Sequence, residues 1–160
     1  MRQDLRGRAK HHQAAAKFYG NWAEVADQDC CGLRPARPTL TLEAKIGDYA
    51  GQKGNELKVH VKATHKCGIR SYFLRIRLTN RSNKAEQWLT VVPKDSKDGI
   101  FQCDPKTGGR DLDLFFEWAP YARHKLPVDS LAGWEVSLRL VVESCCNTQA
   151  TEEKTLKVYF

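Results

Sequence analysis

The stretch LKVHVKA, residues 57–63, decides the fold class of this chain. Leucine, valine and alanine alternate there with lysine and histidine. Successive side chains of a β-strand point to opposite faces of the sheet, so this pattern predicts a strand with one buried and one exposed face. The neighbouring segments repeat the pattern, which therefore describes most of the chain rather than one element.

Working outward from that stretch, we expect further strands wherever the alternation returns. It is clear in residues 39–46, 72–78, 112–118 and 134–142, and we also expect strands at 88–92, 100–103 and 156–160. Glycine, proline, asparagine, aspartate and serine lie between these segments, and no helical pattern interrupts them. The sequence thus predicts a mainly β protein, an antiparallel β-sandwich of the immunoglobulin-like or jelly-roll kind.

The N-terminal part has a different periodicity. Apolar residues recur at spacings of three and four between residues 5 and 26, which predicts a helix with Phe18 and Trp22 on its apolar stripe. Pro35 and Pro38 mark a linker after it. We therefore expect a basic helical extension and linker over residues 1–38 and a β-sandwich domain over residues 39–160.

Length and charge limit the possible functions. A chain of 160 residues suits one core of ordinary size, and its net charge of +7 favours acidic partners. No run is long and apolar enough for a transmembrane helix, and the N-terminus lacks the apolar stretch of a secretory signal. We expect a soluble protein with no visible export address, and the compartment stays open.

The chain has six cysteines, none of them at an alternating core position: Cys30, Cys31, Cys67, Cys103, Cys145 and Cys146. An even number permits three disulfides, in any of fifteen pairings, whereas a reducing compartment would leave thiols. We leave both open and slightly favour thiols. A metal site is least expected, because there is no C-x-x-C motif and adjacent cysteines rarely face one metal, although one from each adjacent pair could. No cofactor is expected.

No motif predicts catalysis. The sequence has no nucleophile elbow and no glycine-rich phosphate loop. His60, His65 and His124 fall on polar faces or in loops and are expected at the surface. The carboxylates Asp111, Asp113 and Glu117 have the spacing of the outward face of a half-exposed strand. We therefore predict that the protein is not an enzyme.

The basic residues of the strands predict a binding surface. Lys58 and Lys62 share the outward face of one strand, and Arg75 and Arg77 share that of the next, together with Phe73. If these strands form a hairpin, the two sets lie side by side in one positive face. The acidic strand around Asp113 would then complement this face, which favours self-association.

The leading hypothesis is a non-enzymatic module that binds protein or assembles with copies of itself. Its expected contacts are Phe18, Trp22, Lys58, Lys62, Phe73, Arg75 and Arg77. An alternative is a nucleic-acid-binding protein that uses the arm formed by Arg2, Arg6, Arg8 and Lys10. That layout is similar to small viral coat proteins, which join a basic arm to a jelly-roll body. A second alternative is a metal or redox protein based on cysteine and histidine.

Overall fold

The computed structural model describes residues 30–89, 91–92, 97–104 and 108–159. The expected helix with Phe18 and Trp22, and the arm with Arg2, Arg6, Arg8 and Lys10, lie outside the described residues. Within the described part the protein is mainly β, and its one helical element is the short 3-10 turn η2 (Lys97–Gly99). No helix in these ranges is long and apolar enough to cross a bilayer.

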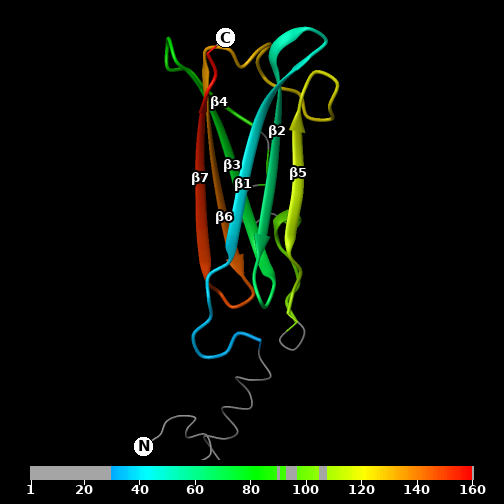
Figure 1. The fold of residues 1–160 in the computed structure, drawn as a ribbon, viewed down its shortest axis with the longest axis vertical. Helices are drawn as coiled ribbons and strands as arrows, with labels where there is room; N and C mark the ends of the chain where they lie inside the picture. Colours follow the sequence, from blue (N-terminus) through cyan, green and yellow to red (C-terminus); the bar gives the residue numbers. More distant parts are fainter. Residues whose placement is uncertain (1–29, 90, 93–96, 105–107, 160) are drawn as a thin grey trace, which may run out of the picture.

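Seven strands form two antiparallel sheets, with the long strands running along the long axis of the molecule (Figure 1). One sheet has the order β1-β2-β5 and the other has the order β4-β3-β6-β7. The bounds are β1 (Thr39–Tyr49), β2 (Gln52–Thr64), β3 (Ile69–Asn80), β4 (Glu86–Trp88), β5 (Leu112–Trp118), β6 (Trp134–Ser144) and β7 (Gln149–Lys157). The predicted mainly β, antiparallel architecture is confirmed.

The inward faces of both sheets contribute to one apolar core. The same buried cluster contains Val59 and Val61 of β2, Ile76 of β3 and Leu140 of β6. All four side chains are almost completely buried. Trp118, at the end of β5, is the largest fully buried side chain. Burial of this apolar surface is the main source of stability, at roughly 25 cal/mol per Å² removed from water. The alternation seen in the sequence therefore marks the core correctly in β2, β3 and β6.

Three expected strand positions were wrong. The fourth strand is Glu86–Trp88 rather than residues 88–92, and residues 100–103 form no strand but one isolated bridge, between Ile100 and Ser71. The last strand occupies residues 149–157 rather than 156–160. Its inward positions include Glu152 and Lys154, which alternation of apolar residues cannot reveal. Such charges are tolerated because β7 is an edge strand, where they also discourage pairing with other chains.

The single basic face is also a wrong prediction. The chain crosses from one sheet to the other between β2 and β3, so these strands do not form a hairpin. Lys58 and Lys62 lie on the outer face of the β1-β2-β5 sheet, whereas Phe73, Arg75 and Arg77 lie on the outer face of the other sheet. The two sets of residues are therefore on opposite sides of the molecule.

At the end of the molecule where β2 passes into β3, two backbone segments come into very close contact. Gly68 has a φ of 89°, and a Cβ atom there would overlap the backbone of Gly109. The Gly109 N–H donates to the Cys67 carbonyl over 2.7 Å, which fixes this approach. Gly68 and Gly109 therefore form a backbone packing contact.

We predict that Gly68→Ala destabilises the protein more than Gly51→Ala. Both glycines have positive φ, but a Cβ at Gly51 would meet nothing within 4 Å. Gly51→Ala should lower the free energy of unfolding by about 1 kcal/mol through backbone strain. Gly68→Ala should lower it by about 1–3 kcal/mol more, because the added Cβ overlaps the backbone of Gly109. Urea unfolding of both variants measures the difference, and equal losses would contradict the close contact.

Candidate functional site

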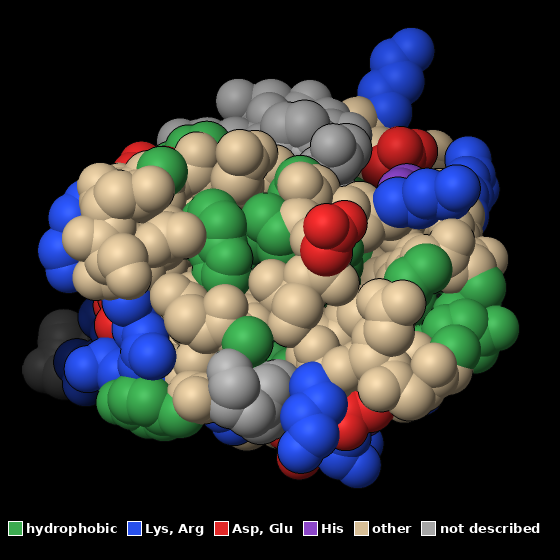
Figure 2. Space-filling view, turned by 90° about the horizontal axis from the view of Figure 1, so that it is seen from above, with side chains coloured by type: hydrophobic (Ala, Val, Ile, Leu, Met, Phe, Trp, Pro, Cys, Tyr) green, Lys and Arg blue, Asp and Glu red, His purple; other side chains and the backbone are tan. Residues whose placement is uncertain are grey.

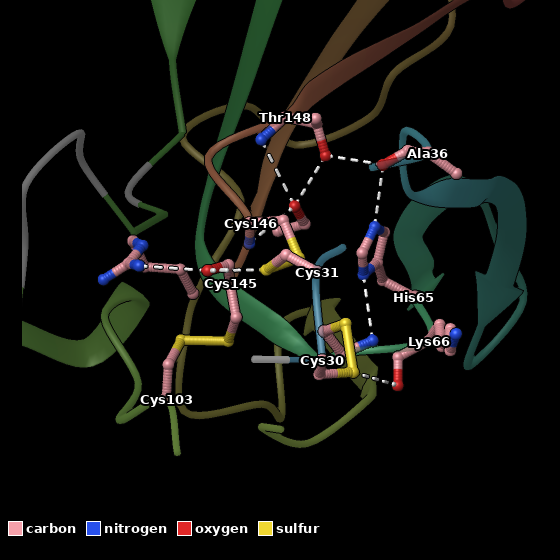
Figure 3. Close-up of a disulfide and its surroundings, with 12 residues drawn as sticks. Cys30, Cys31, Ala36, His65, Lys66, Cys103, Cys145, Cys146 and Thr148 are labelled. Atoms are coloured by element: carbon pink, nitrogen blue, oxygen red, sulfur yellow. Dashed lines mark hydrogen bonds between the residues drawn. A yellow bond between two sulfur atoms is a disulfide. The ribbon is translucent and has the colours of Figure 1, made fainter. Parts of the chain in front are cut away.

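All six cysteines are paired, in three disulfides: Cys30–Cys67, Cys31–Cys146 and Cys103–Cys145. The slight preference for free thiols was therefore wrong. The bridges join four segments at one end of the molecule: the residues before β1, the β2–β3 loop, the residues before β5 and the β6–β7 turn (Figures 1 and 3). We call this region the disulfide end.

The adjacent cysteines act as junctions in this arrangement. Cys30 and Cys31 reach two different segments, and so do Cys145 and Cys146. The four segments are consequently connected in series, from the β2–β3 loop through the residues before β1 and the β6–β7 turn to Cys103. The sequence shows two adjacent cysteine pairs and two single cysteines. This pattern is compatible with two junctions, but it does not show which cysteines are bonded to each other.

A chain of hydrogen bonds runs beside the disulfides (Figure 3). The backbone N–H of Cys67 donates to Nδ1 of His65, whose Nε2 lies 2.7 Å from the Ala36 carbonyl. These two contacts fix the tautomer that carries its proton on Nε2, since a carbonyl oxygen can only accept. The hydroxyl of Thr148 donates to the same carbonyl over 2.7 Å. His65 is therefore a structural residue and not the solvated surface histidine expected from the sequence.

The outer face of the β4-β3-β6-β7 sheet brings together three of the expected contact residues. We define the Arg–Trp face by six neighbouring side chains: Phe73, Arg75, Arg77, Trp88, Arg139 and Val141. The guanidinium carbons of Arg75 and Arg77 lie 5.6 and 5.9 Å from the centroid of the Trp88 ring, within cation–π range. Trp88 is 51% exposed, which is high for a tryptophan in a folded protein.

The arginines of this face are unequally neutralised. Arg77 lies 3.9 Å from Glu86, and Arg139 lies 3.5 Å from Glu153. Arg75 stands directly opposite Arg139 in the strand register and has no carboxylate within ion-pair distance among the described residues. Like charges directly opposite one another destabilise a sheet. Because Arg75 has no carboxylate partner among the described residues, the Arg–Trp face carries one unpaired positive charge beside an exposed aromatic ring.

A shallow groove extends this face towards the disulfide end. It has a volume of about 460 Å³, and Phe73, Ile100 and Val141 form its apolar lining. Ile100 is 49% exposed. Trp88 and Arg139 were missed from the sequence because the register that places them beside Phe73 and Arg75 depends on which strands pair.

The outer face of the β1-β2-β5 sheet has a different centre, which we call the His60 cluster: Glu43, His60, Asp113 and Phe115. Nε2 of His60 lies 2.6 Å from Asp113, and Nδ1 lies 3.4 Å from Glu43. The Phe115 ring stacks on the imidazole with a centroid distance of 4.1 Å and is itself 76% exposed. The hydrogen bond to Asp113, followed by that to Glu43, raises the pKa of His60 above its ordinary value, against an opposing effect of burial.

The carboxylates of β5 lie opposite the basic residues of β2 on this same face. Asp113 and Glu117 stand opposite Lys62 and Lys58 in the register, and Lys58 lies 3.7 Å from Glu117. Glu117 also accepts a 2.7 Å hydrogen bond from Tyr121. Hydrogen bonds to the carboxylates of Glu56 and Glu117 raise the pKa of Tyr121. Asp113 and Glu117 therefore each have a partner within this sheet face, His60 and Lys58 respectively.

Among the described residues, the end of the molecule away from the disulfides carries no comparable concentration of one residue type. Seen from that end, lysine and arginine side chains stand around the rim, and hydrophobic side chains form separate small groups (Figure 2). One arginine of the described residues there, Arg81, stacks on the Tyr159 ring at 4.2 Å from its centroid. The two sheet faces and the disulfide end are thus the distinctive surfaces.

No protein-family model matches this chain, and no curated protein has significant sequence similarity to it.

We predict that removing any one disulfide costs a similar free energy of unfolding. The sequence separations of the bridges are 37, 115 and 42 residues. Because they are connected in series, however, each bridge closes a loop of about 40 residues once the other two are present, which corresponds to about 4 kcal/mol.

Paired serine variants of each disulfide, compared by urea unfolding, test this expectation. Losses that agree within about 1 kcal/mol would support the series arrangement. A clearly larger loss for the Cys31–Cys146 pair would show that the bridges constrain the unfolded chain independently.

We also predict a pH dependence that originates from His60. A histidine whose pKa is raised on folding stabilises the protein fully below its unfolded pKa, near 6.5, and loses that contribution as pH rises through the folded pKa. The free energy of unfolding should therefore decline from about pH 6 to about pH 8. In His60→Gln this decline should be reduced, because the variant lacks the titrating imidazole. An identical pH profile for His60→Gln would refute the assignment.

Proposed function

We propose that this protein is a non-enzymatic, immunoglobulin-like β-sandwich that assembles with copies of itself through the Arg–Trp face. The strand order supports the immunoglobulin-like rather than the jelly-roll alternative. Strands β1, β2 and β5 form one sheet and the other four strands form the second, so the chain passes repeatedly between the two sheets. Greek-key sandwiches of about 100 residues have such connections. A jelly roll would instead need eight strands in two such keys.

The composition of the Arg–Trp face supports a protein contact. Tryptophan and arginine are the residues most enriched at the energetic centres of protein interfaces, where a polar rim surrounds them. Trp88, Arg75 and Phe73 form such a centre here, and glutamates lie around it. The main support for the proposal is the exposed Trp88 ring, which has the guanidinium groups of both Arg75 and Arg77 within cation–π range on the outer sheet face.

The charges of this face favour a second copy as the occupant. The outward positions of the four strands carry Arg75, Arg77, Arg139 and Lys157 against Glu86, Glu135, Glu143 and Glu153, so positive and negative charges are equal in number. A two-fold symmetric interface must be complementary to itself, and central arginines with peripheral glutamates satisfy that condition. The unmet charge of Arg75 would then find a carboxylate of the other copy.

The same balance argues against nucleic acid on this face. Phosphate binding needs a run of cations that are not already neutralised, because affinity arises from the release of counterions. Here Arg77 and Arg139 each have a glutamate partner. The three disulfides further support an oxidising compartment as the place of action, since disulfides are rare in reducing ones.

The test compares oligomeric state by light scattering after size exclusion at several protein concentrations. We expect a dimer that Trp88→Ala and Arg75→Glu each weaken about 30-fold, as expected for the loss of a contact worth ~2 kcal/mol. Phe115→Ala is the matched control, because it removes an exposed aromatic ring from the opposite sheet.

Two results would contradict the proposal. A monomer at every concentration would exclude self-assembly, and a dimer that Phe115→Ala disrupts but Trp88→Ala does not would place the interface on the other sheet. Co-eluting material that absorbs at 260 nm would favour nucleic acid instead.

A further inference from the structure

The disulfide end holds three sulfur atoms that belong to different segments and lie unusually close together. The Sγ atoms of Cys31, Cys67 and Cys146 are all within 4.8 Å of one another. Cys31 comes from the residues before β1, Cys67 from the β2–β3 loop and Cys146 from the β6–β7 turn. Two disulfides therefore lie against each other here, and the group takes one cysteine from each adjacent pair.

From this geometry we propose that, once Cys30–Cys67 and Cys31–Cys146 are reduced, Cys31, Cys67 and Cys146 form a three-thiolate zinc site. A Zn–S bond of about 2.3 Å requires neighbouring sulfurs about 3.8 Å apart in a tetrahedral site. Cys67 Sγ already lies within 4.8 Å of both other sulfurs, whereas the bonded sulfurs of Cys31 and Cys146, 1.98 Å apart, separate once their disulfide is reduced. Three protein ligands leave the fourth position to water or another small donor.

The surroundings suit such a site. A cavity of about 660 Å³ lined by all three cysteines and Arg70 provides access and a compensating positive charge. His65 accepts the backbone N–H of Cys67, and Ser144 accepts that of Cys146, so two ligand residues are held by bonds independent of the disulfides. The Sγ atom of Cys30 lies 3.5 Å from the Lys66 carbonyl, which its thiol could contact after reduction.

For each of the two disulfides, one equivalent of a phosphine and one water molecule supply two electrons and two protons. Two thiols form from each disulfide, and each phosphine becomes a phosphine oxide. Zinc then displaces the protons of Cys31, Cys67 and Cys146, and Cys30 remains a thiol. The metal would connect the same three segments in the reduced chain that the disulfides connect in the oxidised chain. This inference is independent of the proposed self-assembly.

The experiment reduces the full chain anaerobically with a phosphine, removes the reductant, adds Zn²⁺ and measures metal per chain by elemental analysis after gel filtration. Co²⁺ in a parallel sample reports thiolate coordination through its charge-transfer absorption. We expect about one zinc per reduced chain and none in the oxidised chain.

Cys67→Ser and Cys103→Ser are the matched variants, because only the first removes a ligand. The reduced Cys67→Ser protein should bind zinc at least ~10-fold more weakly, and reduced Cys103→Ser should bind like the unaltered chain. Circular dichroism decides whether the site forms in the folded protein. A reduced chain that unfolds and recovers its β spectrum on zinc addition supports the proposal.

Three outcomes would overturn the inference. The reduced chain could bind no zinc, Cys67→Ser and Cys103→Ser could lose zinc affinity equally, or only a chain without β structure could bind zinc.

Discussion

The series of three disulfides is the constraint on which the arrangement of this molecule depends. The apolar core explains why two sheets form, because their inward faces have no other way to leave water. It does not fix residues 30–37, which are absent from the buried cluster. Those residues are held by Cys30 and Cys31, and the carbonyl of Ala36 binds His65 and Thr148 beside them. Disulfides and hydrogen bonds thus position this segment, which burial in the apolar core does not fix.

The two sheets divide their outward residues between different chemistries. On the β1-β2-β5 sheet, neighbouring strands supply both partners of each charge pair, and His60 lies between two carboxylates under the Phe115 ring. On the other sheet, Arg75 faces Arg139 and turns to Trp88 instead of to a carboxylate. The first arrangement pairs Lys58 with Glu117 and His60 with Asp113 and Glu43. The second leaves one charge and one aromatic ring exposed, which is the pattern expected where a partner completes the surface.

The sequence predicted the strands well where burial imposes a period of two, as in β2 and β3. It failed at β7, because an edge strand with Glu152 and Lys154 pointing inward has no such period. It also failed at the basic face. A strand pattern states which residues share a face but not which strands are neighbours, and Lys58 and Arg75 were separated by a crossing between sheets. The disulfide partners were likewise inaccessible, since fifteen pairings satisfy the same six positions.

Peptide mapping without reduction tests whether the three disulfides connect the four segments in series. Trypsin places the cysteines on four separate peptides: residues 18–45, 67–70, 98–106 and 140–154. The series arrangement predicts that all four remain in one covalent assembly, with no cysteine available to an alkylating reagent, and separate only on reduction. Two unconnected pairs of peptides, or an alkylated cysteine in any of them, would contradict it.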